Sequence, residues 1–288
     1  MSQSGGEGSG DRRRSFSLGA DFPIRTAAAV IMAGGALGLA WVGGFPFLVF
    51  WLAAGVGVVW EWQRLIGGRR LWARTAIGAA ALIIASPFAL HESVAYAAGI
   101  IVVGAVASGY VADAGRRFEV GAGVIYAGAM VVGINVLRAS PEYGFAATLW
   151  VFAVVWGTDV AAYVGGRLIG GPKLWARVSP GKTWSGAIVG ALASAVLGVG
   201  FAAAAPGPLK ILAMAALGLA VSVFSQAGDL FESALKRRAG VKDSSHLIPG
   251  HGGLMDRLDG FVVGVALATT IAFARHSGAG IASGLFLW

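Results

Sequence analysis

Long runs of apolar residues without a charged side chain constrain this sequence more than any other feature. Of its 288 residues, 57% are hydrophobic and only 12% are charged, about half the charged fraction of a soluble domain. A membrane-spanning helix needs about 20 mostly apolar residues, and these runs are long and uncharged rather than alternating as in membrane β-strands. The sequence therefore predicts an all-α, polytopic integral membrane protein with about nine transmembrane helices, over residues 26–43, 45–62, 75–91, 94–111, 121–137, 145–165, 185–204, 210–228 and 260–275.

The basic residues predict the orientation of these helices. If all nine runs cross the membrane, nineteen of the 22 Lys and Arg residues fall on the side of the N-terminus, and only Arg138, Lys210 and Arg275 fall on the other. Because cytoplasmic loops are enriched in Lys and Arg, we expect a cytoplasmic N-terminus. The predicted organisation is a mobile cytoplasmic tail over 1–25, about five N-terminal transmembrane helices over 26–144, and a C-terminal catalytic membrane region over 145–288 with cytoplasmic loops 166–184 and 229–259.

Composition narrows the chemistry further. The chain has no cysteine, which excludes a disulfide framework, a thiolate metal site and a cysteine nucleophile. The net charge of +8 comes from the predicted cytoplasmic loops, so we expect no nucleic-acid partner. Glycines four residues apart, Gly34 with Gly38 and Gly166 with Gly170, predict close approach of neighbouring helices.

Charged side chains are concentrated in residues 229–259, which carry ten of them. Asp229 and Glu232 lie one turn apart at the end of a predicted helix, and Asp256 and Asp259 share a face if the next helix begins there. Hard carboxylate oxygens suit Mg²⁺, which uses one or two carboxylates together with substrate phosphates. The alternative for either Asp256 or Asp259 is a helix cap. Cations for phosphate groups accompany these carboxylates: Lys236, Arg237, Lys242 and Arg257.

A second polar segment spans residues 156–185. Asp159 lies inside a predicted membrane helix, where an ionisable residue is a functional candidate by default; the alternative is a structural ion pair with Arg167 or another loop cation. Residues 176–183 resemble a relaxed phosphate-binding P-loop, but that loop needs a preceding β-strand and an α/β fold, which we do not expect between membrane helices. The remaining prediction is a phosphate-sized cluster at the cytoplasmic boundary, formed by Ser179, Lys182 and Thr183.

Residues 233–259 resemble the signature of the phosphatidate cytidylyltransferase family. That signature runs Ser-x-apolar-Lys-Arg, then Lys-Asp, then a small residue, Pro and His-Gly-Gly, and ends Asp-Arg-apolar-Asp. The resemblance covers the C-terminal half closely, whereas the first five predicted helices match only as hydrophobic segments. Thirteen positions agree: Ser233, Lys236, Arg237, Lys242, Asp243, Ser245, Pro249, His251, Gly252, Gly253, Asp256, Arg257 and Asp259.

This resemblance implies the reaction CTP + phosphatidate → CDP-diacylglycerol + pyrophosphate, which serves phospholipid biosynthesis. It implies a homodimer in a bacterial inner membrane, with the active site on the cytoplasmic side. Mg²⁺ would be held by Asp229 and Asp256, beside a second cation such as K⁺. The implied catalytic residues are Lys242, Asp243, His251, Arg257 and Asp259, and the implied substrate-binding residues are Asp159, Ser179, Lys182, Thr183, Lys236, Arg237, Gly252 and Gly253. The chain departs from the family pattern at Val160, Ser185 and His246, which receive no role.

Two other functional classes share some of these features. An ion-coupled multi-pass transporter would show paired half-repeats and polar sites near the membrane midplane, but the sequence has no convincing internal repeat and its charges gather at one edge. A polyprenyl-phosphate sugar-phosphate transferase would share Mg²⁺ and the acidic residues. Assays with CTP and UDP-sugars separate the two enzymes, and uptake into proteoliposomes tests the transporter.

Overall fold

The computed structural model describes residues 22–202, 208–248 and 252–288. Within these ranges the chain forms long helices joined by short connections, with one small β-hairpin. The elements are α1 (Phe22–Val42), α2 (Gly44–Ile66), α3 (Leu71–Leu90), α4 (Val94–Val111), η1 (Ala114–Arg116), α5 (Arg117–Ala139), α6 (Gly144–Ile169), β1 (Lys173–Trp175), β2 (Ser179–Thr183), α7 (Trp184–Ala202), α8 (Pro208–Arg238), α9 (Met255–Arg275) and α10 (Ser283–Phe286).

Eight of the helices in the described ranges, α2 to α9, are long and apolar enough to cross a membrane. They coincide with eight of the nine predicted runs, so the prediction of an all-α polytopic membrane protein is confirmed. The remaining run corresponds to α1, of which Val30–Val42 forms a shorter apolar helix. A ninth crossing by α1 and a cytoplasmic N-terminus stay predictions.

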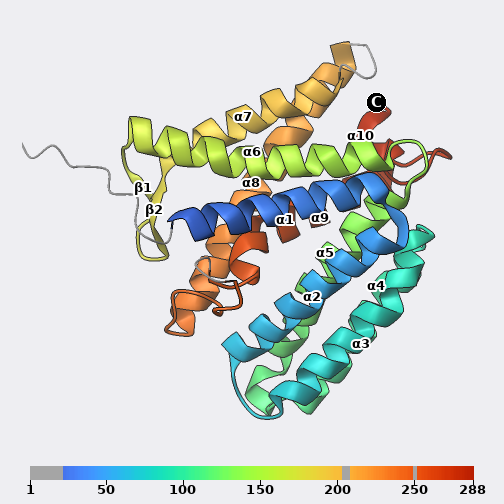
Figure 1. Ribbon diagram of the computed structural model, residues 1–288, viewed down its shortest axis with the longest axis vertical. Helices are drawn as coiled ribbons and strands as arrows, with labels where there is room; N and C mark the ends of the chain where they lie inside the picture. The colour runs from blue at the N-terminus through green and yellow to red at the C-terminus, as the bar shows by residue number, and fades with distance from the viewer. Residues whose placement is uncertain (1–21, 203–207, 249–251) are drawn as a thin grey trace, which may run out of the picture.

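The helices form two groups that are inclined to each other (Figure 1). Helices α1, α6 and α7 run roughly alongside one another, whereas α2, α3, α4 and α5 form a second set that slants away from them. Within the groups, α6 packs on α7 and α7 on α8, while α3 packs on α4 and α4 on α5. Helix α9 contacts both α5 and α8 and so joins the two groups.

A buried aromatic cluster fixes α2 against α6 and α9. The ring of Trp51 on α2 stacks on Phe261 of α9 with centroids 4.8 Å apart, and its centroid lies 6.0 Å from that of Phe152 on α6. All three side chains are buried, and aromatic pairs of this kind add about 0.5–1.5 kcal/mol beyond the burial of their area. The cluster therefore holds α2 beside α9, which matters for the polar site below.

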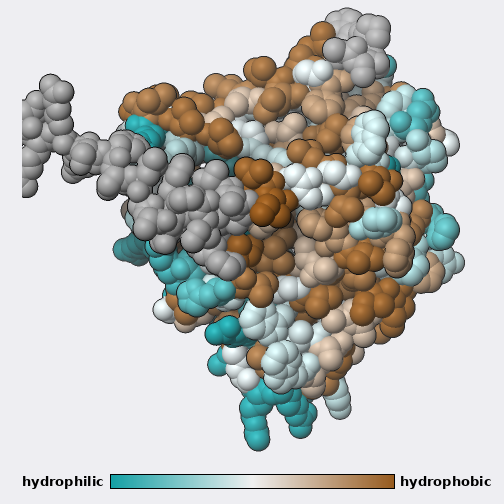
Figure 2. Space-filling view, in the orientation of Figure 1, coloured by the Kyte–Doolittle hydropathy of each residue, from teal (hydrophilic) through white to brown (hydrophobic). Residues whose placement is uncertain are grey.

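Loops that the sequence assigns to one side of the membrane do lie together. At the opposite, less basic end, Arg138 donates to the carbonyl of Ala40 at 2.6 Å, and Glu92 accepts the backbone N–H of Ile281 at 2.8 Å. Apolar residues cover the middle of the visible face, with polar residues nearer the ends (Figure 2). At the basic end three contacts join separate connections: Arg69 N with Asp113 (3.0 Å), Arg238 with Glu119 (2.9 Å) and Arg237 Nε with Val178 O (3.4 Å).

Two predicted loops differ from the structure. Residues 229–238 form the last part of α8, because charged side chains one helical turn apart can pair, as Glu232 and Lys236 do at 2.6 Å. The connection 166–184 contains the antiparallel hairpin β1–β2, with Trp175 opposite Ser179. Its strands are too short to give a clear alternating pattern. Because this small sheet is antiparallel and the surrounding elements are helices, the P-loop interpretation of 176–183 still has no α/β fold to support it.

The predicted glycine packing is confirmed at one of the four positions. A Cβ at Gly166 would lie 2.9 Å from Thr183 Oγ1 and 3.5 Å from the Cα of Gly186, so the start of α7 approaches α6 closely there. The prediction is wrong for Gly34, Gly38 and Gly170, whose Cβ positions meet no atom of the described residues within 4 Å. A spacing of four places two glycines on one face but does not determine whether a neighbour covers that face.

Candidate active site

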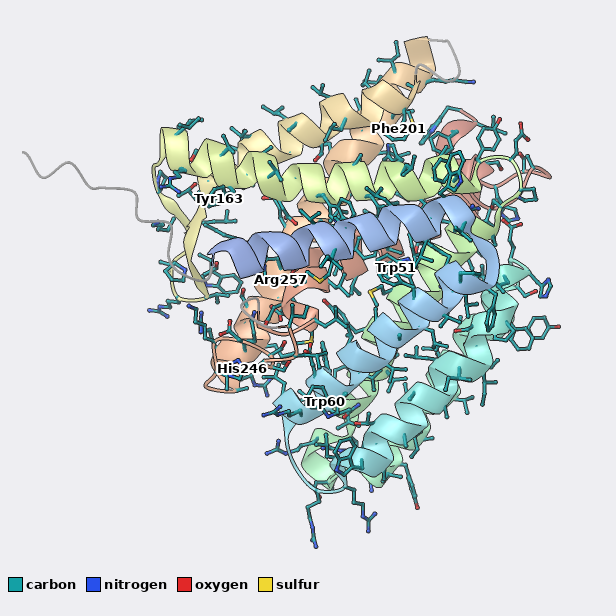
Figure 3. The ribbon with its side chains drawn as sticks, viewed as in Figure 1. Trp51, Trp60, Tyr163, Phe201, His246 and Arg257 are labelled. Atoms are coloured by element: carbon teal, nitrogen blue, oxygen red, sulfur yellow. The ribbon has the colours of Figure 1, made fainter. Side chains whose placement is uncertain are left out.

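The two polar segments of the sequence meet at the basic end of the molecule. Strand β2 contributes Lys182, α8 contributes Asp229, and α9 contributes Asp256 at its first turn. Arg257 and His246 lie at this end as well, far from Phe201 (Figure 3). Residues from the hairpin and from both of the last two long helices therefore share one region.

Asp229 connects α8 to the hairpin. Its carboxylate forms an ion pair with Lys182, and each of the two side chains is about a quarter exposed, at 26% and 27%. Ser233, one turn later on α8, donates its hydroxyl to the other oxygen of Asp229 at 3.4 Å. Asp159 on α6 is exposed and within electrostatic reach of both Asp229 and Lys182. Lys182 is thus a cation near Asp159, and the Arg167 guanidinium donates to the hydroxyl of Tyr163 at 2.7 Å.

Asp256 is held by both α8 and the connection that precedes α9. Lys236 Nζ lies 2.6 Å from Asp256 Oδ1 and 2.6 Å from Glu232 Oε2. The backbone N–H groups of Ser244 and Gly253 donate to Asp256 Oδ2 at 3.0 and 2.8 Å. The bond from Gly253, three residues earlier, is a capping-box contact at the start of α9, so Asp256 caps its own helix as well as binding Lys236 and Ser244.

The carboxylates of this region outnumber its lysines. Asp259 is within electrostatic reach of Asp159, Asp229 and Glu232, and Glu232 is fully buried beside both Lys236 and Asp256. Buried carboxylates that share a single lysine, as Glu232 and Asp256 share Lys236, favour a bound cation. Among the described residues, no three His, Asp or Glu side chains converge to hold a metal on their own. Mg²⁺ uses one or two carboxylates together with phosphates and water, and the residues that would hold it here are Asp229 and Asp256.

Thr183, a predicted substrate-binding residue, is buried and contacts the start of α7. Its hydroxyl accepts the backbone N–H of Gly186 at 3.1 Å, the arrangement of a helix N-cap. Its Oγ1 also lies 3.0 Å from the hydroxyl of Ser185, which in turn donates to the carbonyl of Gly170. Ser185 therefore ties the start of α7 to the end of α6, and both hydroxyls have structural partners.

The other predicted site residues lie around the connection between α8 and α9. Arg237 binds carbonyl groups of Val178 and Val241 at 3.4 and 3.1 Å and so links α8 to the hairpin. A Cβ at Gly252 would lie 3.0 Å from Asp256 Oδ2. The side chains of Lys242, Asp243 and Arg257 are exposed and that of Ser179 is partly buried. His251, a predicted catalytic residue, lies outside the described residues, so its role stays a prediction.

One residue in this region was missed by the sequence analysis. Glu61, near the end of α2, is fully buried and accepts hydrogen bonds from residues 244, 245, 254 and 255. The available signal was a single carboxylate at the end of an otherwise uncharged apolar run, which is unusual in a membrane helix. Its partners lie 183 to 194 positions away in the sequence, so no local pattern reveals them.

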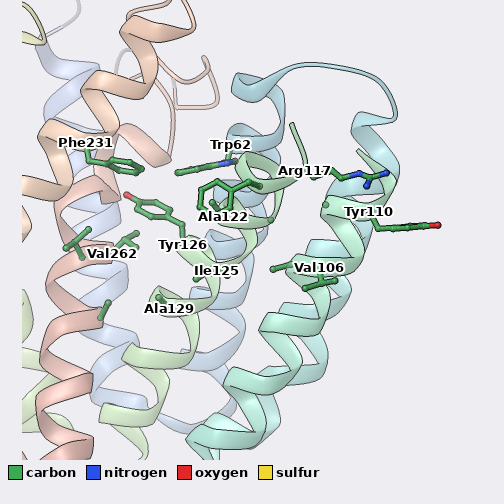
Figure 4. Close-up of a pocket in the computed structure, with 16 residues that line it drawn as sticks. Trp62, Val106, Tyr110, Arg117, Ala122, Ile125, Tyr126, Ala129, Phe231 and Val262 are labelled. Atoms are coloured by element: carbon green, nitrogen blue, oxygen red, sulfur yellow. The ribbon is translucent and has the colours of Figure 1, made fainter. Parts of the chain in front are cut away.

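An apolar pocket of about 800 Å³ is lined by residues of α2, α4, α5, α8 and α9, among them Phe231, which precedes Glu232 in the chain (Figure 4). Part of its wall is formed by the rings of Trp62, Tyr126 and Phe231, with Trp62 and Tyr126 centroids 5.1 Å apart. The hydroxyl of Tyr126 donates to the backbone carbonyl of Asp259 at 3.1 Å. Tyr126 therefore contributes both to the wall of the pocket and to a contact with the first turns of α9.

Comparison with known proteins agrees with this arrangement. The model of the cytidylyltransferase family matches residues 23–274. A phosphatidate cytidylyltransferase of Brucella suis is 40% identical over 246 residues, which cover 84% of this chain and 90% of that protein. The protein of the same name from Pseudomonas aeruginosa is 31% identical over 259 residues, which cover 83% and 94% of the two chains. One from Bacillus subtilis is 41% identical over 126 residues, covering 44% of this chain and 47% of that protein.

The family match extends over α1 to α9 and includes both polar segments and every carboxylate described above. Two relatives cover more than four fifths of the chain at 30% identity or higher. The chain belongs to the cytidylyltransferase family.

Proposed function

We propose that this membrane enzyme transfers the cytidylyl group of CTP to phosphatidate, giving CDP-diacylglycerol and pyrophosphate, at the cytoplasmic edge of the bilayer. The observation that carries the proposal is the meeting of five carboxylates and two lysines at the basic end of the helices. Such a cluster suits a reaction between one phosphate in the lipid surface and another dissolved in water. The names of the relatives specify which phosphates these are.

The reaction needs positioning and charge neutralisation more than proton transfer. An oxygen of the phosphatidate phosphate attacks the α-phosphorus of CTP, a new P–O bond forms, and the bond to the pyrophosphate oxygen breaks. Because the attacking phosphate is already an anion, no general base is required. Most of the catalysis would come from groups that hold both phosphates in line and offset their charge.

The ion pairs of Lys182 and Lys236 support a role of these lysines in neutralising charge. Each lysine neutralises one of the two aspartates that we propose as metal ligands, Asp229 and Asp256. When Mg²⁺ and CTP bind, the ion would neutralise charge on the nucleotide phosphates, and Lys182 would turn from Asp229 to a phosphate group. Arg257, Lys242 and Asp243 are exposed beside this region, where they can orient the substrates.

The apolar pocket is a candidate site for an acyl chain of the lipid substrate. A substrate with acyl chains needs an apolar site within reach of the polar one. The pocket reaches the ring of Tyr126, whose hydroxyl donates to the backbone carbonyl of Asp259. We place an acyl chain of phosphatidate there, with its phosphate turned toward Lys182.

The test is incorporation of radiolabelled CTP into lipid by the purified protein. With phosphatidic acid and Mg²⁺ we expect a labelled lipid that requires both, and EDTA should stop the reaction until excess Mg²⁺ is added. Diacylglycerol, which lacks the phosphate, is the matched acceptor control and should give no product. Labelling from a UDP-sugar but not from CTP, or activity that is indifferent to chelation, would contradict the proposal.

A further inference from the structure

We propose that Glu61 is a positioning residue: from α2 it fixes Ser244, Ser245 and the start of α9, and through them the carboxylate of Asp256. The inference rests on the proposed function, since Asp256 is the residue that we propose holds the metal ion. The Glu61 side chain is fully buried, at 0% exposure, and it lies about three helical turns beyond Trp51, which fastens α2 to α9. It is therefore on a rigid element.

The hydrogen bonds of Glu61 are divided evenly between its two oxygens. Each oxygen accepts one backbone N–H and one serine hydroxyl. Oε1 accepts from Leu254 N at 2.9 Å and from the Ser245 hydroxyl, whereas Oε2 accepts from Met255 N at 2.6 Å and from the Ser244 hydroxyl at 3.2 Å. Both N–H groups belong to the start of α9, where a negative charge is also favoured by the helix dipole.

The same chain segment carries the donors that hold Asp256. Ser244 gives its hydroxyl to Glu61 and its backbone N–H to Asp256 at 3.0 Å, and Gly253, next to Leu254, gives its N–H to Asp256 at 2.8 Å. Glu61 and Asp256 thus accept hydrogen bonds from the same two stretches of chain, at Ser244 and at residues 253–255. Moving these residues changes the orientation of the Asp256 carboxylate, although Glu61 itself touches no substrate.

Only a carboxylate satisfies this set of donors. In Glu61→Gln the amide NH₂ replaces one acceptor oxygen, and a serine hydroxyl can rotate to accept from it. The backbone N–H on that side cannot rotate, so one donor at the start of α9 is left facing another donor, whichever way the amide is turned. The variant keeps the size of the side chain and removes only the charge and one acceptor.

The experiment is hydrogen–deuterium exchange of the purified full-length protein in lipid nanodiscs, without nucleotide. For Glu61→Gln we expect exchange in peptides covering 244–258 to quicken by about 10- to 100-fold, the factor expected for a lost hydrogen bond to a charged group. Exchange in α6 and α7 should stay at its wild-type rate. In the CTP assay, kcat should fall about 10-fold or more and the half-saturating Mg²⁺ concentration should rise, with KM for phosphatidate unchanged. A loss of folded enzyme would lower kcat but would not move that Mg²⁺ concentration.

Glu92→Gln is the matched control. Glu92 also accepts a serine hydroxyl and a backbone N–H, from Ser140 and Ile281, but at the opposite end of the molecule. In Glu92→Gln, hydrogen–deuterium exchange should quicken only around residues 280–283. Its kcat and its dependence on Mg²⁺ should stay those of the wild type.

The proposal is overturned by Glu61→Gln with wild-type exchange over 244–258, or by faster exchange there with wild-type kcat and Mg²⁺ dependence. If Glu61→Gln does not fold, the double variant Ser244→Ala, Ser245→Ala takes its place. In it, exchange over 244–258, kcat and the half-saturating Mg²⁺ concentration should each change in the same direction by a few-fold. Wild-type values of all three would overturn the proposal. If the wild-type protein makes no CDP-diacylglycerol, the proposed function fails, while the hydrogen exchange of Glu61→Gln still decides whether Glu61 fixes Ser244, Ser245 and the start of α9.

Discussion

Two lysines of the site have different surroundings, and we expect different consequences when they are removed. Lys236 is nearly buried, with 10% of its side chain exposed, between Glu232 and Asp256, whose side chains are 0% and 6% exposed. Lys182 is 27% exposed and has Asp229 as its ion-pair partner. Removing one member of a buried ion pair leaves an uncompensated charge, whereas a partly exposed pair contributes little to stability.

The first prediction follows from this contrast. Lys236→Met should destabilise the protein by about 3–5 kcal/mol, whereas Lys182→Met should change its stability by at most about 1 kcal/mol. Both should lose CTP-dependent turnover, Lys182→Met by about 100-fold, the loss typical of removing one group that stabilises transition-state charge. Thermal unfolding in detergent and the radiolabel assay measure the two effects. Equal stability of the two variants would show that Glu232 and Asp256 do not depend on Lys236.

At the scale of the structural elements, substitution of Gly253 tests whether this glycine, just before α9, serves packing or phosphate binding. A Cβ there would overlap the Ser244 hydroxyl and lie 2.8 Å from Glu61 Oε1. Gly253→Ala should therefore displace the connection, cost about 1–3 kcal/mol of stability as overpacking does, and lower activity at least about 10-fold. Gly115→Ala, at the same end with no described atom within 4 Å of its Cβ, is the control and should behave as the wild type.

A second substitution separates the two interpretations of Gly253. If packing is the reason for this glycine, adding Ser244→Ala removes the overlapping hydroxyl and should restore part of the activity of Gly253→Ala. If the backbone of Gly253 binds a phosphate instead, the double variant should be no more active than Gly253→Ala alone.

The helices could be predicted from the sequence because an apolar run long enough to cross a bilayer leaves little alternative to a helix. The two strands of the hairpin could not, since three to five residues show no decisive period. The continuation of α8 through Asp229 was missed because its charges were interpreted as a loop, although Glu232 and Lys236 have the four-residue spacing of a helical ion pair. The role of Glu61 depends on contacts between distant parts of the chain, which a single sequence does not specify.

At the scale of the whole molecule, the loop contacts agree with the predicted alternation of sides, and labelling can establish which side is which. The chain has no cysteine, so single-cysteine variants report one position each. We expect a membrane-impermeant maleimide to label Glu142→Cys in intact spheroplasts, and to label Ser17→Cys and His246→Cys only after permeabilisation. Labelling of Ser17→Cys in intact spheroplasts would mean that α1 does not cross and that the chain has eight spans.

The central claim is that Asp229 of α8 and Asp256 of α9 hold one divalent ion between them. The most direct measurement is Mn²⁺ binding to the purified protein by electron paramagnetic resonance in the presence of CTP, for the wild type, Asp229→Ala and Asp256→Ala. We predict one tight site in the wild type and at least about 100-fold weaker binding in each variant, because two ligands of one ion cannot replace each other. Retention of the tight site in either variant would contradict the shared ion and the mechanism built on it.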